Sequence, residues 1–358
     1  MQIATFTDYI NTPSSRFRIR QYFSALERNG IVVHDYYRKL STESAGRSNG
    51  GGRIRDSIPL MAKAVVHESA NILLRFYESI DSNRYDAVWL SRQLIIGYPS
   101  FEFMIRKPLI YDIDDAIFLN GKVSYFQFRK TAERACAVIA GNDFLAEEAE
   151  KYNSNVTVVP TAVDTCRWAP RRGLSEIALI GADSFRIGWS GTSSSFEFFL
   201  PLQRELKRFF TDFPTAKLLI MADRFPNELY DLKEFIEFVK WSPENEVSFI
   251  QSLDVGLMPI KDDSWSKGKC AYKMLLYAAC GIPVIVTPIG VNRTILAEAE
   301  LGVGAVQPSE WYEAMEMLFN DNDMRGRFGK NGVRLIKEKY SVATCALKIE
   351  KILRHSLK

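Results

Sequence analysis

The chain has 358 residues, about twice the length of an ordinary domain, so we expect two packed domains. Hydrophobic residues make up 47% of the chain and charged residues 25%, which excludes disordered, collagen-like and low-complexity proteins. The 46 basic and 43 acidic side chains leave a net charge of +3, which is too small to indicate nucleic-acid binding by charge.

The cysteines do not indicate a zinc site or a disulfide framework. They are five in number, without a Cys-x-x-Cys pair, and only three histidines could complement them. The first residues, Met1 to Asp8, lack the basic stretch and the apolar run of a secretory signal. We therefore expect a protein of a reducing compartment, the cytoplasm.

Short apolar runs alternate with amphipathic helical stretches along nearly the whole chain. This alternation is typical of βαβ units that form a parallel sheet covered by helices. In the first half, strands are predicted at residues 3–7, 31–36, 87–90, 109–111, 137–140 and 156–159. A glycine-rich insertion at residues 46–52 lacks the order of a phosphate-binding P-loop, and we expect a mobile surface loop there.

The second half repeats the alternation after a break at residues 169–173. Strands are predicted at residues 186–190, 217–221, 236–239, 254–258, 283–286 and 303–306. We place the domain boundary between Gly173 and Phe185. The predicted domains are residues 1–170 and 186–340, and residues 341–358 form a helix that could cross back to the first domain.

One uncharged stretch, from Met274 to Val291, reaches the length at which a membrane-spanning helix is considered. Gly281 and Pro283 would end a helix after Cys280, and Pro288 would end a short strand. We therefore predict a buried helix followed by a buried strand.

In open parallel sheets, ligands bind at the carboxyl ends of the strands. The first strand of the second half ends in residues 188–195, which are small and hydroxylated, and a helix is predicted to follow through Phe210. The free amides and the positive dipole at the start of such a helix suit a phosphate. Simple capping by Ser193 or Ser194 explains the same residues equally well.

A stronger signal is a group of lysines after the strand at 254–258. Lys267, Lys269 and Lys273 lie where the loop enters the next helix, and Lys269 and Lys273 are one helical turn apart. Their ammonium groups could share a face and bind one anion, such as a leaving diphosphate. A solvated basic surface is the alternative. A bound anion is favoured because like charges repel at this spacing and a helix N-terminus disfavours cations.

Three further groups are weaker candidates. Residues 288–293 form a tight turn whose amides could face a ligand, or an ordinary turn capped by Asn292. Arginines alternate along residues 14–20, after the first strand. Asp112 and Asp114 are predicted on one side of a strand end, with Asp115 opposite, where carboxylates can act as a general base, bind sugar hydroxyls or cap the next turn.

Together these residues resemble family 4 glycosyltransferases. In the second half the resemblance lies in residues 254–260 (DVGLMPI), 268–284 (GKCAYKMLLYAACGIPV) and 288–293 (PIGVNR). In the first half, residues 15–18 (SRFR), 111–116 (YDIDDA), 139–142 (IAGN) and 159–164 (VPTAVD) are similar to the acceptor-half motifs of a branch that builds bacterial cell-surface polysaccharides. The resemblance covers nearly the whole chain.

The resemblance implies an α/β protein with two Rossmann-like domains facing across a cleft, the GT-B fold. It implies an enzyme that moves a sugar, with retention, from a nucleotide-diphospho-sugar to a polysaccharide or lipid-linked saccharide, with no cofactor and no obligatory metal. We assign catalytic roles to Lys269, Lys273 and Asp114. The residues expected to bind the donor are Gly191, Thr192, Val239, Lys240, Trp241, Lys267, Gly268, Val291, Asn292 and Arg293. Those expected on the acceptor side are Ser15, Arg16, Arg18, Asp112, Asp115 and Asn142.

The chain departs from the family pattern at two places. Many members carry two glutamates separated by seven residues, and these positions hold Gly268 and Leu276 here. The arginine and lysine that often follow the first donor-half strand are absent from residues 188–195, so Lys269 and Lys273 are the candidates to replace them.

Two alternative functions follow from the same residues. Asp112-Ile-Asp114 is a D-x-D of the kind that metal-dependent, single-domain glycosyltransferases use, although two series of βαβ units argue against that fold. The missing glutamates are also compatible with a non-catalytic subunit that binds nucleotide sugars or acts as a scaffold.

A peripheral membrane contact is a further expectation. Residues 1–60 carry nine basic and five acidic side chains, and residues 60–80 are amphipathic, with Phe76 and Tyr77 near the end. Such a segment could lie on the anionic inner face of the cytoplasmic membrane. A helix packed on the protein surface is the ordinary alternative.

Overall fold

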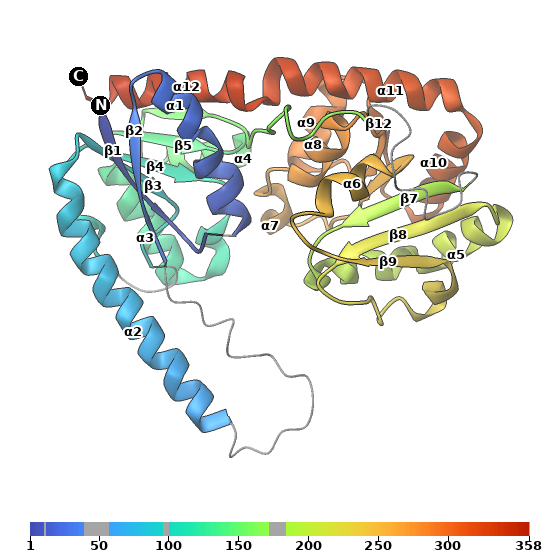
Figure 1. Cartoon of the computed structure of the whole chain (residues 1–358), viewed down its shortest axis with the longest axis horizontal. Helices are drawn as coiled ribbons and strands as arrows, with labels where there is room; N and C mark the ends of the chain where they lie inside the picture. Colours follow the sequence, from blue (N-terminus) through green and yellow to red (C-terminus); the bar gives the residue numbers. More distant parts are fainter. Residues whose placement is uncertain (11, 39–56, 96–99, 172–183, 358) are drawn as a thin grey trace. The chain divides into compact units, whose positions relative to one another are not determined.

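The computed structural model describes residues 1–10, 12–38, 57–95, 100–171 and 184–357, with only the backbone of residues 57–66. The chain divides into two compact units (Figure 1). Unit 1 is Met1–Thr161 with Cys345–Lys358, and unit 2 is Ala162–Thr344. The glycine-rich insertion at 46–52 and most of the interval in which we placed the domain boundary lie outside the described residues.

Unit 1 contains a six-stranded sheet with the order β2-β1-β3-β4-β5-β6, in which all neighbours are parallel. Its strands are β1 (Gln2–Thr7), β2 (Val32–Tyr37), β3 (Ala87–Ser91), β4 (Leu109–Ile113), β5 (Ala137–Ala140) and β6 (Val156–Val158). Its helices include η1 (Ser15–Ile19), η2 (Arg20–Tyr22), α1 (Phe23–Arg28), α2 (Ser57–Asp81), η4 (Ser82–Arg84), η5 (Glu102–Met104), η6 (Ile117–Asn120), α3 (Lys122–Arg134) and α4 (Asp143–Glu150). Most of the last helix, α12 (Val342–His355), belongs to this unit.

Unit 2 contains a second parallel sheet of six strands, in the order β12-β11-β10-β7-β8-β9. Its strands are β7 (Phe185–Ser190), β8 (Ala216–Ala222), β9 (Ile236–Lys240), β10 (Val255–Met258), β11 (Val284–Val286) and β12 (Gly302–Gly304). The helices are η7 (Ser193–Leu202), α5 (Gln203–Asp212), η8 (Tyr230–Phe235), α6 (Glu246–Gln251), α7 (Ser264–Lys267), α8 (Tyr272–Ala279), α9 (Gly290–Glu298), α10 (Pro308–Asn320), α11 (Asn322–Leu335) and η9 (Ile336–Tyr340).

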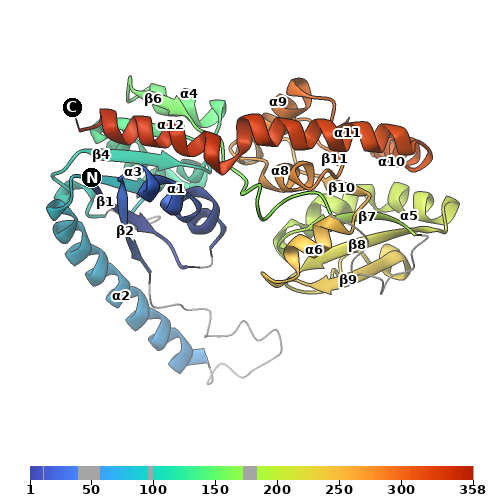
Figure 2. The same cartoon turned by 45° about the horizontal axis from the view of Figure 1, so that its top comes forward.

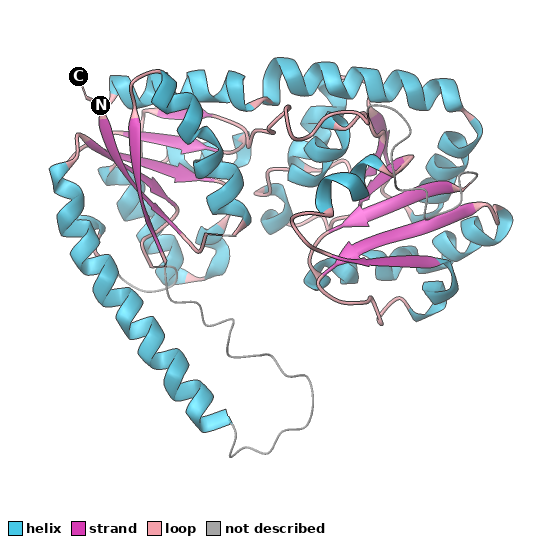
Figure 3. Cartoon of the chain, in the orientation of Figure 1, coloured by secondary structure: helices cyan, strands magenta, loops and turns pink. Residues whose placement is uncertain are grey.

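The predicted strands are confirmed in both halves, and helices accompany the strands in each unit (Figure 3). The last predicted strand, at 303–306, is displaced toward the N-terminus, since β12 is Gly302–Gly304. The apolar stretch after Met274 forms the rest of α8 and then the buried strand β11, as predicted. No helix among the described residues is long and apolar enough to cross a bilayer.

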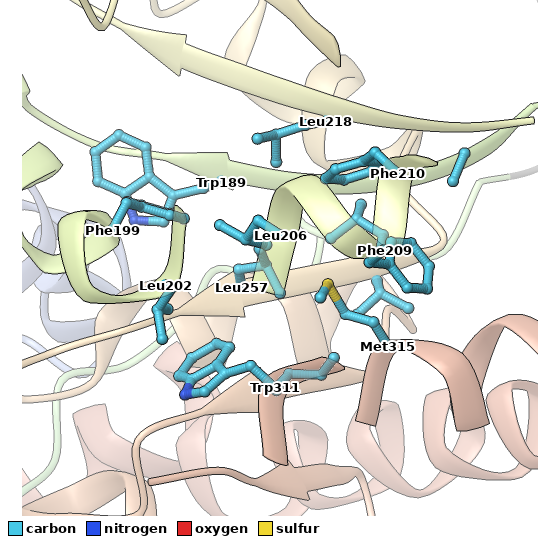
Figure 4. Close-up of a cluster of buried hydrophobic side chains, with 14 of the residues drawn as sticks. Trp189, Phe199, Leu202, Leu206, Phe209, Phe210, Leu218, Leu257, Trp311 and Met315 are labelled. Carbon is cyan, nitrogen blue, oxygen red and sulfur yellow. The ribbon is translucent and has the colours of Figure 1, made fainter. Parts of the chain in front are cut away.

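A large aromatic and aliphatic core fills one side of the unit 2 sheet (Figure 4). There Trp189 of β7 packs against Phe196 and Phe199 of η7, with ring centroids 5.6 Å apart in both pairs. Trp189 is 2% exposed, so its indole is held rigidly at the end of β7. This position matters for the site described below.

Helix α8 packs against α11, which lies beside it (Figure 2). A Cβ at Gly329 would lie 2.3 Å from the Gly281 carbonyl oxygen, and a Cβ at Gly332 would lie 3.1 Å from that of Ala278. Glycine at these positions lets the α11 backbone approach the end of α8 closely.

The segment at residues 162–171 belongs to unit 2, so unit 1 ends earlier in the chain than residue 170. The Val163 amide donates to the Tyr340 carbonyl oxygen, and the Gln251 side chain donates to the Ala169 carbonyl oxygen. These long-range hydrogen bonds hold the segment against unit 2, which a local hydrophobic pattern does not reveal.

Candidate active site

The candidate active site of unit 2 lies at the carboxyl ends of β7 and β10. These two strands are neighbours in the sheet. The chain leads from β7 to β8 on one side of this pair, and from β10 to β11 on the other side. Connections that leave adjacent strand ends in opposite directions create the crevice where ligands bind in open α/β sheets. Gly191 and Thr192 follow β7, and the lysine group follows β10.

Gly191 and Lys273 are in direct contact at this point. A Cβ on Gly191 would lie 2.4 Å from Cζ2 of Trp189 and 2.8 Å from Cε of Lys273, so only glycine fits. The Lys273 ammonium lies 5.3 Å from the centroid of the Trp189 ring. The lysine side chain therefore lies across the glycine and ends over the indole, a cation–π arrangement.

The electrostatic environment of Lys273 favours its neutral form. Desolvation and, to a smaller extent, the positive charge of Lys269 together lower the pKa of Lys273 to about 8. Within the described part of the chain, Lys273 has no carboxylate partner, since the only charged group that shifts its pKa is Lys269. An anion bound here would gain a cation that is not already neutralised.

The prediction that Lys269 and Lys273 lie on one helix is wrong. Helix α7 ends at Lys267 and α8 begins at Tyr272, while Ala271 between them has a left-handed backbone with φ of 52°. Lys269 therefore lies in a turn, with its ammonium 5.3 Å from the Phe198 ring centroid. The turn still brings the two charges within interaction range, as the pKa of Lys273 indicates.

Lys267 and the start of α9 lie together beside this turn. Gly290 has φ of +48°, and a Cβ there would lie 3.1 Å from the Lys267 backbone. The residue before α9, Ile289, has no side-chain cap, so no side chain of the described residues caps the first amides of the helix. Lys267 forms an exposed ion pair of 3.2 Å with Asp262. Gly268 is buried beside it.

The other residues predicted in this turn have internal partners. The Asn292 side chain is 1% exposed and donates to the Thr287 carbonyl oxygen at 3.0 Å. The Arg293 Nε donates to the Pro288 carbonyl oxygen at 2.9 Å. Val291 is half-buried against the core. Asn292 therefore stabilises the turn from inside α9 and does not cap the helix.

A carboxylate, Asp223, binds the loop after β7. Its two oxygens accept hydrogen bonds from the Ser193 amide at 2.6 Å and from the Ser193 hydroxyl at 2.8 Å. Burial raises the pKa of Asp223, but these hydrogen bonds outweigh it and hold the pKa below its ordinary value. Capping by Ser193 or Ser194 is therefore wrong, since η7 begins at Ser193 itself. Only the position of Asp223 directly after a predicted strand could have indicated this role.

Residues Val239 to Trp241 are at the edge of the sheet. Val239 is half-buried and Lys240 is exposed at the end of β9, which β7 and β8 separate from the lysine group. The Trp241 indole donates to Glu246 at 3.4 Å. Leu276, at a glutamate position of the resembled family, is 4% exposed and belongs to the core around α8.

In unit 1, Arg18 and Asp112 form a buried ion pair. Their side chains are 1% and 0% exposed, and the Arg18 Nε lies 2.6 Å from Asp112 Oδ1. Arg18 also donates to the Val159 carbonyl oxygen, and the Trp89 indole donates to Asp112. This network joins η1, β3, β4 and the segment after β6 inside the unit.

Asp114 and Asp115 share a different arginine, Arg92. The Arg92 Nε lies 2.8 Å from Asp114, and Nη2 of the same side chain pairs with Asp115. The predicted alternation of sides is wrong because β4 ends at Ile113 and the chain turns there. Burial raises the pKa of Asp114, but Arg92 outweighs it and the pKa lies below its ordinary value.

The remaining acceptor-side residues are in separate places. Ser15 is 1% exposed and accepts a hydrogen bond of 2.7 Å from the Thr12 hydroxyl. The Arg16 guanidinium lies over the Phe17 ring. Asn142 caps α4 by accepting from the Leu145 amide at 3.0 Å. In the described residues no group of three histidine, cysteine or carboxylate side chains could hold a metal ion. The carboxylates of the D-x-D pair with different arginines.

Comparison with known proteins identifies this region. Residues 192–321 match the family model described as Glycosyl transferases group 1. The chain is a glycosyltransferase. The predicted enzyme class is thereby confirmed, and the matched residues include the lysine group and the start of α9. No curated protein sequence matches the glycosyltransferase significantly.

Solved structures resemble the glycosyltransferase over nearly its whole length. HepE of Anabaena in complex with UDP and glucose has a TM-score of 0.65 and 14% identity, with 99% of each chain covered. A glycosyltransferase of Rickettsia africae has a TM-score of 0.70 and 14% identity, with 100% of this chain and 98% of that chain covered. Sucrose-phosphate synthase of Thermosynechococcus elongatus has a TM-score of 0.66 and 14% identity, with coverages of 99% and 98%. These similarities confirm the predicted GT-B fold.

Proposed function

We propose that this glycosyltransferase transfers a sugar, with retention, from a nucleotide-diphospho-sugar to a saccharide acceptor. The observation that carries the proposal is the position of Lys273. The half-buried Lys273 side chain lies against Gly191 at the end of β7, its ammonium lacks a carboxylate partner within the described residues, and its pKa is lowered to about 8. A cation in this state gains more from a bound diphosphate than an exposed, ion-paired lysine does.

The leaving diphosphate is the group whose negative charge grows during transfer. Lys273 and Lys269 neutralise it from the turn between α7 and α8, and the uncapped amides at the start of α9 add a positive dipole end. These groups replace the positive residues missing after β7. Removal of one such donor typically costs about 3 kcal/mol of transition-state stabilisation.

Uridine nucleotides are the first donors to test. HepE of Anabaena has been solved with UDP and with UDP-glucose, at 15% and 14% identity to this chain. The bacterial polysaccharide acceptor follows only from the resemblance of residues 15–18, 111–116, 139–142 and 159–164. A polysaccharide or lipid-linked saccharide remains the proposed acceptor class.

The test is the variant Lys273→Met, which keeps the side-chain length and removes the charge. We expect sugar transfer and UDP-sugar hydrolysis to fall at least about a hundredfold. The melting temperature should stay equal or rise, because a partly desolvated charge without a carboxylate partner is removed. Lys207→Met, on the exposed face of α5, is the matched control and should behave as wild type.

Wild-type turnover by Lys273→Met would overturn the assigned role. Donor binding without turnover in the unmodified protein, given a panel of acceptors, would instead favour a scaffold subunit. Transfer that survives EDTA is expected, and its loss would contradict a metal-independent mechanism.

We also propose that the enzyme works in the cytoplasm at the inner face of the membrane, bound peripherally through α2. Four apolar side chains of α2 lie at helical spacing and are 40–70% exposed: Leu73, Phe76, Tyr77 and Ile80. We call this group the α2 stripe. An apolar face of this kind suits insertion into the headgroup boundary. The basic surplus of residues 1–60 supports an anionic leaflet as the surface.

A further inference from the structure

Trp189 is a core residue of unit 2 that also contacts the lysine group. Its indole is 2% exposed and packs against Phe196 and Phe199 (Figure 4). The Lys273 ammonium lies over the same ring, 5.3 Å from its centroid. The indole therefore contacts both the apolar core and a cation of the candidate active site.

The backbone after β7 leaves room for this contact and for nothing larger. A Cβ at Gly191 would lie 2.4 Å from Cζ2 of Trp189 and 2.8 Å from Cε of Lys273. Either distance is shorter than real Cβ contacts, so a side chain here would displace the indole or the lysine. The Gly191 amide donates to the Met221 carbonyl oxygen at 3.0 Å, which fixes this backbone against β8. Gly191, Trp189 and Lys273 therefore fit together as a set.

A second buried contact fixes α8, which carries Lys273, relative to β7. Tyr277 lies one helical turn after Lys273 and is 0% exposed. Its hydroxyl oxygen accepts a hydrogen bond of 3.2 Å from the Ser190 amide. Its ring packs so closely on β10 that a Cβ at Gly256 would lie 2.5 Å from Cγ of Tyr277. The residue next to Trp189 is thereby joined to the helix of Lys273, and the lysine starts from a fixed position.

The charged groups around Lys273 do not attract its ammonium. Among the described residues, only Lys269 in the turn between α7 and α8 shifts the pKa of Lys273 by its charge, and it repels. The Asp263 carboxylate caps α7 and interacts with Lys269, and the Asp223 carboxylate binds Ser193. The indole face is thus the group that favours the charged lysine.

We propose that Trp189 is a positioning residue for sugar transfer, whose indole face keeps the Lys273 ammonium charged and in place at the end of β7, where the leaving diphosphate binds. Trp189 is buried, so it acts through Lys273. The attraction between a cation and an aromatic face stabilises only the protonated amine. The inference rests on the proposed function, because that function places the diphosphate at Lys273.

The position of the Lys273 pKa makes this attraction matter near neutral pH. With a pKa of about 8, Lys273 is mostly charged at pH 7. A downward shift of one unit would leave about half of the enzyme without this charge at that pH. Loss of the indole face therefore removes a cation from the donor site even though the lysine itself remains.

The test compares Trp189→Leu, which removes the aromatic face, with Trp189→Phe, which keeps a smaller one. Calorimetry on the full chain measures UDP affinity across the pH range in which Lys273 loses its proton. We expect Trp189→Leu to lower the pH midpoint of the decline in affinity by about 0.5 to 1.5 units, and Trp189→Phe to lower it by less than half as much. The ionisation of UDP is the same in every sample, so a difference between variants reports on the protein.

Phe209→Leu is the matched control for damage to the core. Phe209 is 0% exposed in the same core, and its ring packs against Phe213 and Tyr312. This variant should lower the melting temperature, as Trp189→Leu does, but leave the pH midpoint unchanged. Lys273→Met should remove the pH-dependent decline, which assigns the decline to Lys273.

A second measurement does not require a stable leucine variant. In the wild-type protein with isotope-labelled lysine, NMR should show an upfield ring-current shift of the Lys273 side-chain protons, since the end of this side chain lies over the indole. The spectrum of Lys273→Met identifies the signal. Trp189→Phe should reduce the shift, because its ring is smaller.

Three outcomes would overturn the inference: an unchanged pH midpoint in Trp189→Leu, an equal change in Phe209→Leu, or no ring-current shift of Lys273 in the wild-type protein. Failure of the proposed function gives a different result. If Lys273→Met leaves UDP affinity unchanged, the proposed diphosphate site is wrong and the inference falls with it. If Lys273→Met weakens binding while both Trp189 variants behave as wild type, the inference alone is contradicted.

Discussion

At the residue scale, the chemistry of the proposed donor site depends on one half-buried cation, Lys273. Lys273 is held between the Gly191 backbone and the Trp189 indole, and Trp189 is packed by Phe196 and Phe199. Because its pKa falls from 10.5 in the unfolded chain to about 8 in the folded chain, the charge opposes folding fully below about pH 8, and this cost declines to zero as the pH rises toward 10.5. Lys273 lies at a strand end, where a bound diphosphate can offset this unfavourable free energy.

We expect UDP binding to be coupled to proton uptake near pH 8.5. Free Lys273 is mostly neutral above pH 8, and a bound diphosphate raises its pKa, so the complex takes up a proton. Calorimetry in buffers of different ionisation enthalpy measures this uptake. At pH 6.5 Lys273 is already protonated and should contribute none. Buffer-independent heats at pH 8.5, or the same uptake in Lys273→Met, would contradict the assignment.

At the element scale, α2 combines two faces with different tasks. Its Arg75 donates to the carbonyl oxygens of Thr7 and Tyr36 at the ends of β1 and β2. The α2 stripe instead exposes Leu73 and Tyr77 at 70% and 66%. One helix therefore binds the strand ends of unit 1 and carries the proposed membrane contact.

We expect Leu73→Ser combined with Tyr77→Ser to lower the affinity for vesicles at least about tenfold, since two large apolar side chains are removed from the contact. Co-sedimentation with vesicles containing phosphatidylglycerol measures the effect. The matched control replaces Leu200 and Tyr230, exposed apolar residues of unit 2, by serine. Equal binding of both double variants would show that the α2 stripe does not contact the membrane.

At the scale of the whole molecule, the two ends of the chain build unit 1 together. Residues Cys345–Lys358 belong to unit 1 although they follow unit 2 in the chain. In α12, Ile349 and Leu353 are 1% and 0% exposed, and the Arg354 side chain donates to the Asn29 carbonyl oxygen at 2.6 Å. The stability of unit 1 therefore depends on the last helix.

We expect Leu353→Ala to lower the free energy of unfolding of unit 1 by about 2–4 kcal/mol, because it leaves a cavity where a fully buried side chain was. Leu347→Ala, on the same helix but 64% exposed, should change it by less than about 0.5 kcal/mol. Hydrogen exchange of the β1 and β3 amides during denaturant titration reports on unit 1. Equal protection in the two variants would show that α12 does not stabilise this unit.

Much of the fold could be predicted because hydrophobic periodicity and glycine or proline breaks are local. Each predicted strand is present. The apolar stretch forms α8 followed by β11 and not one long helix, as Gly281 and Pro283 indicated. The proximity of Lys269 and Lys273 was also predicted, although from a helix that the left-handed Ala271 interrupts. A periodic pattern of residues does not reveal a break of this kind between two short helices, α7 and α8.

The amino-acid sequence by itself determined the alternation of strands and helices, the parallel sheets and the lysine group, since these depend on neighbours a few residues apart. Only the tertiary structure decided that Asp223 binds Ser193, that Arg92 binds both Asp114 and Asp115, and that Asp112 is buried with Arg18. These pairs join residues 22 to 94 positions apart. The order of strands in a sheet decides which strand ends become neighbours. That order depends on the free energy of the whole chain and not on local sequence.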